Sequence, residues 1–113
     1  MVVSIEDLGA VTLVKMKGQL VHPEGDAELR ERFKEALDKG KSKFVFDLAG
    51  VPYCDSAGLG EMIACVKRAR EAGGDVKFAG LNQRVSDTFM LLGMGQIVEI
   101  YGSTTEAIGY YTS

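Results

Sequence analysis

Residues 43–60 read KFVFDLAGVPYCDSAGLG, and their pattern is the clearest indication of the fold class in the chain. The first six residues, KFVFDL, form a nearly unbroken apolar run, which is typical of a strand covered on both faces. The residues after the run predict a loop, and the segment from Ser56 or Ala57 to Gly73-Gly74 predicts an amphipathic helix. Its expected buried stripe consists of Leu59, Met62, Ile63, Val66 and Ala69. A buried strand that leads through a loop into such a helix indicates an α/β domain.

The same alternation extends in both directions from this stretch. Val2–Asp7 and residues 11–16 predict strands that form an antiparallel hairpin around Gly9, and Leu20-Val21 predicts a brief pairing segment. Further strands are expected at residues 76–79 and 97–101. We therefore predict one domain over residues 1–113, with a mostly parallel four- to five-stranded sheet, an antiparallel edge strand and about four helices.

Three more amphipathic segments predict the other helices. The first has Pro23 in its first turn, carries Leu29, Phe33, Ala36 and Leu37 on one stripe, and ends at Gly40. The next begins after Asn82 as N-cap and places Val85, Phe89 and Leu92 on one face. In the last, Ser103 and Glu106 have the spacing of a capping box.

Composition narrows the classes of function. The chain has 113 residues, a net charge of −3 and no basic stripe, so nucleic acid is not expected as a partner. The apolar runs are too short to cross a bilayer, and residues 1–7 do not resemble a signal peptide. No membrane partner is expected, and elimination favours the cytoplasm.

Catalytic and cofactor-binding patterns are missing from the sequence. The two cysteines, Cys54 and Cys65, are expected to be plain small hydrophobes, and the single histidine, His22, lies far from them in sequence. The chain has no phosphate-binding P-loop motif and no evident nucleophile beside its histidine. We expect no enzyme activity, no metal, no cofactor and no small-molecule substrate.

The candidate site is the segment Asp55-Ser56-Ala57-Gly58-Leu59-Gly60. In open α/β sheets, functional residues gather at the carboxyl ends of the strands, where this segment is expected. The first N–H groups of a helix lack partners and favour an anion, so a phosphoryl group on Ser56 would be well placed. Asp55 is the expected N-cap. These residues alone also fit a simpler interpretation, in which Asp55 and Ser56 only cap the helix.

Residues 44–60 resemble the signature of STAS domains, most closely that of the bacterial anti-sigma factor antagonists. The resemblance continues through residues 73–81, Val85, Phe89 and residues 92–94, and it spans the chain from about Val11 to Ile108. It implies that Ser56 is the phosphoacceptor. The implied partner is an anti-sigma factor that is also a serine kinase and brings its own ATP and Mg²⁺. The unphosphorylated antagonist binds this kinase and frees a sigma factor, phosphorylation ends the binding, and a serine phosphatase restores it.

The partner-binding surface is expected to surround Ser56. Its predicted members are Tyr53, Asp55, Ser56, Ala57, Gly58, Glu61 and Met62, with Cys65, Met90 and Met94 as further candidates. Gln19, His22, Pro23 and Cys54 depart from the usual antagonist pattern.

Two other interpretations concern the same fold class. STAS domains also serve as subunits of lipid-transport ABC complexes and as interaction modules of stress-sensing assemblies. A receiver domain phosphorylated on Asp47 or Asp55 is disfavoured, because no acidic pair follows the first strand and residues 77–80 do not end in lysine.

Overall fold

The computed structural model describes residues 1–112, which form a five-stranded mixed sheet with strand order β1-β2-β3-β4-β5. The strands are β1 (Val2–Asp7), β2 (Thr12–Lys17), β3 (Lys43–Gly50), β4 (Asp75–Ala79) and β5 (Ile100–Tyr101). Only β1 runs antiparallel to its neighbour, and the pairs β2–β3, β3–β4 and β4–β5 are parallel. The predicted sheet and its antiparallel edge strand are confirmed.

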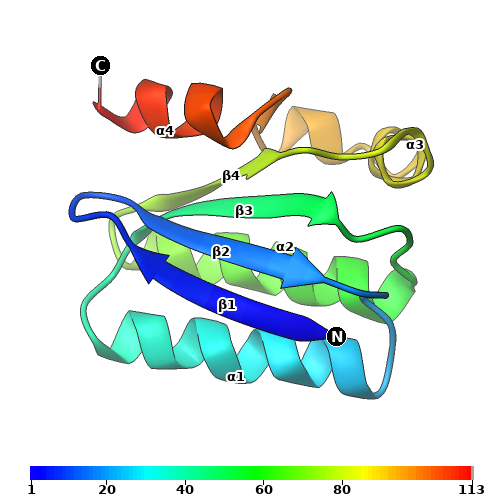
Figure 1. Ribbon diagram of the computed structural model, residues 1–113, viewed down its shortest axis with the longest axis horizontal. Helices are drawn as coiled ribbons and strands as arrows, with labels where there is room; N and C mark the ends of the chain where they lie inside the picture. The colour runs from blue at the N-terminus through cyan, green and yellow to red at the C-terminus, as the bar shows by residue number, and fades with distance from the viewer. Residues whose placement is uncertain (113) are drawn as a thin grey trace.

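Four α-helices lie within the described residues: α1 (Glu24–Asp38), α2 (Ser56–Glu71), α3 (Gln83–Leu91) and α4 (Thr104–Thr112). Helices α1 and α2 cover one face of the sheet and α4 covers the other, while α3 lies near the carboxyl end of β3 (Figure 1). Asn82 caps α3 as expected, since its Oδ1 accepts the Val85 N–H at 2.8 Å. The Ser103 Oγ accepts the Glu106 N–H at 3.2 Å, which confirms the predicted start of α4. None of these helices has the length and apolar character needed to cross a membrane.

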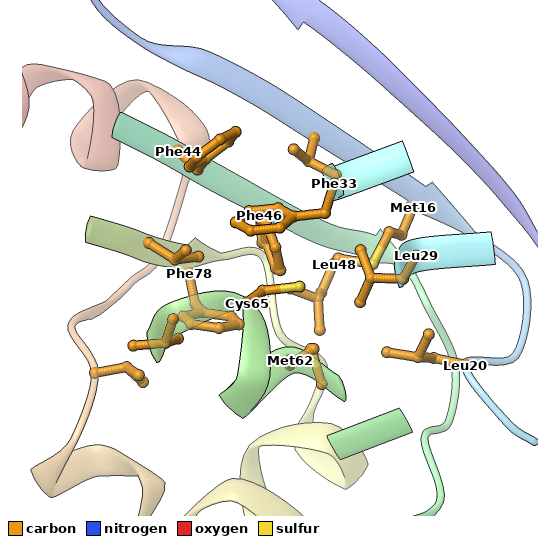
Figure 2. Close-up of a cluster of buried hydrophobic side chains, with 14 of the residues drawn as sticks. Met16, Leu20, Leu29, Phe33, Phe44, Phe46, Leu48, Met62, Cys65 and Phe78 are labelled. Carbon is orange, nitrogen blue, oxygen red and sulfur yellow. The ribbon is translucent and has the colours of Figure 1, made fainter. Parts of the chain in front are cut away.

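A series of phenylalanine rings runs through the main core between the sheet, α1 and α3. Phe33 of α1 contacts Phe44 with ring centroids 4.5 Å apart, and Phe46 contacts Phe78 at 5.3 Å (Figure 2). Phe78 in turn meets Phe89 of α3 at 5.5 Å. The Phe46–Phe78 and Phe78–Phe89 pairs are edge-to-face and the Phe33–Phe44 pair is tilted, and aromatic pairs in such orientations add to the free energy gained by burial. These contacts fix α3 beside the end of β3, where the candidate site lies.

Four details of the sequence prediction are wrong. Ile63 is 40% exposed at the edge of the buried stripe of α2, where it lies beside Ile97. Leu92 follows the last residue of α3 and is 57% exposed. The predicted strand at residues 97–101 shrinks to Ile100–Tyr101, because the 3₁₀ turn η1 (Met94–Gln96) delays its start. Pro23 occupies the N-cap position of α1 and not the first turn.

The brief pairing predicted for Leu20-Val21 is a single bridge between Leu20 and Cys54. This bridge joins the segment before α1 to the loop before α2, and Leu20 is fully buried there. The pairing therefore holds the loop that leads to α2 against the core.

Candidate functional site

Ser56 is the first residue of α2 and follows the loop that leaves β3. Its side chain is exposed, and its hydroxyl has no hydrogen-bond partner among residues 1–112. The carboxyl end of β3, which delivers this loop, is also the end at which α3 lies (Figure 1). The topology therefore presents a free hydroxyl group at the point where sequence analysis placed it.

Asp55 fixes the backbone on both sides of this hydroxyl. Its Oδ1 accepts the Gly58 N–H at 2.8 Å, and its Oδ2 accepts the His22 N–H at 3.0 Å. These two bonds, that from Gly58 first, hold the pKa of the Asp55 carboxyl below its ordinary value. The Asp55 N–H also donates to the Leu20 carbonyl at 3.2 Å. The predicted N-cap is confirmed, and it also anchors the segment before α1.

Gly58 lets α2 approach this segment closely. A Cβ atom at position 58 would lie 2.1 Å from the Leu20 carbonyl oxygen, which is far inside contact distance. A Cβ atom at Gly60 would meet nothing within 4 Å. Gly58 is thus required by packing of the backbone, whereas Gly60 leaves the helix surface open.

A hollow of about 350 Å³ lies beside Ser56, between the start of α2 and the helix α3. Arg84 and Tyr53 form one side of it, with the Arg84 guanidinium carbon 4.4 Å from the centroid of the Tyr53 ring. The remaining lining includes Thr88, Leu92 and the buried side chains of Cys54, Leu59 and Val85. The Ser56 hydroxyl group, the Arg84 guanidinium and several apolar side chains therefore line the same hollow.

Several residues predicted for the partner surface lie in the interior instead. Met62 and Cys65 are fully buried (Figure 2), and Gly58 and Met94 are buried as well. They lie on the faces of α2 and η1 that pack against the core. These four residues are corrections to the expected surface, since a partner cannot reach them in this conformation.

Glu61 is a correction of a different kind. Its carboxylate is buried and accepts hydrogen bonds from Arg30 Nε at 2.7 Å and from an Arg68 amino group at 3.3 Å. The pair with Arg30 links α2 to α1, so Glu61 stabilises the packing of these two helices and is not part of an accessible surface. Tyr53, Asp55, Ser56 and Ala57 remain accessible, and Met90 is 55% exposed.

His22 and Asp26 extend the polar contacts behind Asp55. The His22 Nδ1 lies 3.0 Å from Asp26 Oδ2, and this bond is the main cause that lowers the pKa of the Asp26 carboxyl. Sequence analysis did not identify Asp26 or Arg84 as part of this region. The four-residue spacing from His22 to Asp26 is one available signal. The place of Arg84, just after a strand that ends at the same edge of the sheet, is another.

The cysteines lie in the core. Cys54 and Cys65 are both free thiols, and burial raises the pKa of each. Among the residues that the structure describes, no group of three His, Cys, Asp or Glu side chains is arranged to hold a metal ion. The candidate site is therefore built from a hydroxyl, an arginine and an adjoining surface.

Comparison with known proteins identifies relatives of this chain. The family model described as "Mlab, STAS domain" matches residues 3–99. The anti-sigma-B factor antagonist of Listeria monocytogenes is 33% identical over 79 residues, covering 66% of this chain and 69% of that protein. The anti-sigma F factor antagonist of Paenibacillus polymyxa is 25% identical over 107 residues, covering 94% of this chain and 91% of that protein.

A solved structure from Thermotoga maritima, assigned as an anti-sigma factor antagonist, has the same fold. It superposes with a TM-score of 0.91 at 24% identity and covers 98% of this chain and 95% of its own.

Proposed function

This chain belongs to the STAS domain family, and from this premise we propose that it is an anti-sigma factor antagonist that is switched by phosphorylation of Ser56. In its unphosphorylated form it binds an anti-sigma factor that is also a serine kinase. The kinase transfers the γ-phosphoryl group of ATP to the Ser56 Oγ, with loss of the hydroxyl proton and release of ADP. A serine phosphatase removes the phosphate and restores binding.

One observation carries this proposal: the Ser56 hydroxyl is exposed and has no hydrogen-bond partner in residues 1–112. A kinase can reach such an oxygen without unfolding the helix. A phosphoryl group on the first residue of α2 also lies near backbone N–H groups that have no partner within the helix. These donors favour an anion at this position.

The docking surface that we propose joins the Ser56 loop to the end of α3. Tyr53, Asp55, Ser56 and Ala57 supply the loop side. The other side consists of exposed apolar side chains: Met90, Leu91 and Leu92, of which Leu92 lines the same hollow as Ser56. Exposed apolar residues that adjoin a polar site are typical of protein-binding surfaces. A kinase packed on this surface covers the serine that it modifies.

The change in charge is large enough to act as a switch. A phosphate adds about −1.5 to −2 charges at neutral pH. When it is buried at an interface beside the Asp55 carboxylate, it meets repulsion and a desolvation cost. A loss of about 3 kcal/mol weakens binding on the order of a hundredfold. No refolding of the antagonist is needed for this effect.

The test is phosphorylation of the purified chain by its cognate kinase. Ser56→Ala abolishes incorporation of phosphate, whereas Ser4→Ala, which changes an exposed serine on β1, leaves it unchanged. The affinity of the kinase is then measured for two variants that cannot be phosphorylated at position 56, Ser56→Asp and Ser56→Ala. We expect the aspartate variant to bind more weakly, because it places a negative charge on the docking surface. Equal affinities, or phosphate on another residue, would contradict the proposal.

The class of partner can be tested separately. The wild-type chain used as bait is expected to retain a serine kinase, and Ser56→Asp is expected to retain less of it. Recovery of a transporter ATPase in place of a kinase would instead support a role as a subunit of a transport complex.

A further inference from the structure

Arg84 differs from the other arginines of this chain. Within residues 1–112, Arg84 forms no ion pair, whereas the remaining arginines each lie beside a carboxylate: Arg30, Arg32, Arg68 and Arg70. Its guanidinium instead lies over the Tyr53 ring. In a chain with a net charge of −3, an exposed guanidinium at the candidate site that has no ion-pair partner within residues 1–112 is free to bind an anion.

The fold holds Arg84 and Ser56 on the same hollow by a specific contact. The Asn82 side-chain amide donates to the Pro52 carbonyl at 3.2 Å, while its oxygen caps α3. One side chain therefore links the loop that leads to Ser56 with the first turn of α3, which carries Arg84. Both residues line the hollow of about 350 Å³. Their proximity is part of the folded structure and does not depend on a partner.

We propose that Arg84 binds the phosphoryl group when Ser56 is phosphorylated. A guanidinium presents paired N–H donors that match two oxygens of a phosphate. The pairing offsets the repulsion between the phosphate and the Asp55 carboxylate, which stays ionised because Gly58 and His22 donate to it. This inference deepens the proposed function, since it concerns the phosphorylated form of the same serine.

The pairing has a consequence for the docking surface. In the unphosphorylated chain, the Arg84 guanidinium lies over the Tyr53 ring, and both residues line the hollow. A phosphate on Ser56 that attracts the guanidinium moves it away from the Tyr53 ring and exposes more of that ring. One modification then changes both the charge and the shape of the surface that a kinase contacts.

The experiment installs phosphoserine at position 56 during translation, so that no kinase is required. The second pKa of the phosphate, which is about 6 for phosphoserine, is followed by ³¹P NMR titration. We expect Arg84→Gln to raise this pKa by about half a unit or more relative to the chain with Arg84, because a nearby cation favours the dianion. Arg84→Lys keeps the charge and is expected to give an intermediate value.

Arg32→Gln is the matched control, since it removes the same charge from α1 near the opposite end of β3. Arg32 lines a separate hollow with Thr12, whose strand partner Phe44 is the second residue of β3. We expect it to leave the phosphate pKa unchanged. An identical pKa with Arg84 and with Arg84→Gln, in chains that keep the folded amide spectrum, overturns the inference. Failure of every kinase to modify Ser56 would contradict the proposed function, yet it would not affect this measurement.

Discussion

Gly58 and Gly60 lie two residues apart in α2, and the structure predicts opposite effects when each is changed to alanine. Within a helix, alanine is more favourable than glycine by about 1 kcal/mol. At Gly60 a Cβ atom meets nothing within 4 Å, so this gain is not opposed. At Gly58 the Cβ atom would lie 2.1 Å from the Leu20 carbonyl oxygen and 2.8 Å from the Leu20 Cγ.

The cost at Gly58 follows from what must move. An ordinary contact of about 3.5 Å requires the helix and the Leu20 carbonyl to separate by about 1.4 Å. That carbonyl accepts the Asp55 N–H, a bond whose loss costs about 1 kcal/mol. Overpacking of the buried Leu20 side chain adds about 1–3 kcal/mol. After subtraction of the propensity gain of about 1 kcal/mol, Gly58→Ala lowers the free energy of unfolding by about 1–3 kcal/mol.

The assay is urea unfolding of both variants beside the unchanged chain, followed by circular dichroism. Gly60→Ala is expected to raise the free energy of unfolding by about 0.5–1 kcal/mol, since its site is exposed. The two expected shifts together amount to about 1.5–4 kcal/mol, so in a thermal scan the two variants should differ by about 6 °C or more, at about 4 °C per kcal/mol for a domain of this size. If both variants change the free energy of unfolding in the same direction, the result contradicts the close contact between α2 and Leu20 on which the prediction rests.

One labelling experiment and two substitutions test the interior and the charged pairs. Burial raises the pKa of the Cys65 thiol, so iodoacetamide at pH 8 should leave it unmodified in native buffer and modify it in urea; native-state labelling seen by mass spectrometry would contradict this. Glu61→Gln should lower the free energy of unfolding by about 1 kcal/mol, because Arg30 is partly exposed and keeps some hydration; an unchanged urea midpoint would argue against a stabilising role of the pair. The hydrogen bond from Lys77 lowers the pKa of Glu99 from 4.5, so the pair stabilises the fold above the unfolded pKa and loses this effect as pH falls through the folded one. Glu99→Gln should therefore destabilise the chain at pH 7, and this effect should shrink as the pH falls below 4.5; an effect that stays the same size throughout the acid range would oppose the assignment.

The sheet was predictable because its strands carry strong local signals. The apolar run of β3, the hairpin around Gly9 and the cap at Asn82 each depend on residues that are close together in sequence. The position of Ser56 at the start of α2 was predictable for the same reason. Asp55 provides the cap that ends the loop, and this cap is local.

The composition of the surface was harder to predict, because it depends on what packs against α2 from elsewhere in the chain. Glu61 reads as a solvent-facing residue in sequence, yet Arg30 of α1 turns it inward. Met62 lies on the face that meets the core, so its proximity to Ser56 in sequence does not make it accessible. The need for Gly58 arises from Leu20, which is 38 residues earlier by number. Such long-range contacts leave no local pattern.

The same contacts determine how a phosphate on Ser56 can act. Three sets of hydrogen bonds fix the loop before α2. The Asp55 N–H donates to the Leu20 carbonyl, and the Asp55 carboxylate accepts from the Gly58 and His22 N–H groups. The Asn82 side chain, at the start of α3, donates to the Pro52 carbonyl. A modification at the exposed hydroxyl breaks none of these bonds. The phosphorylation that we propose would therefore act at the surface, through charge and through the side chains around the hollow, Arg84 among them. A switch of this kind needs a rigid support, because a loop that yielded to the phosphate would lessen the repulsion that drives a bound partner away.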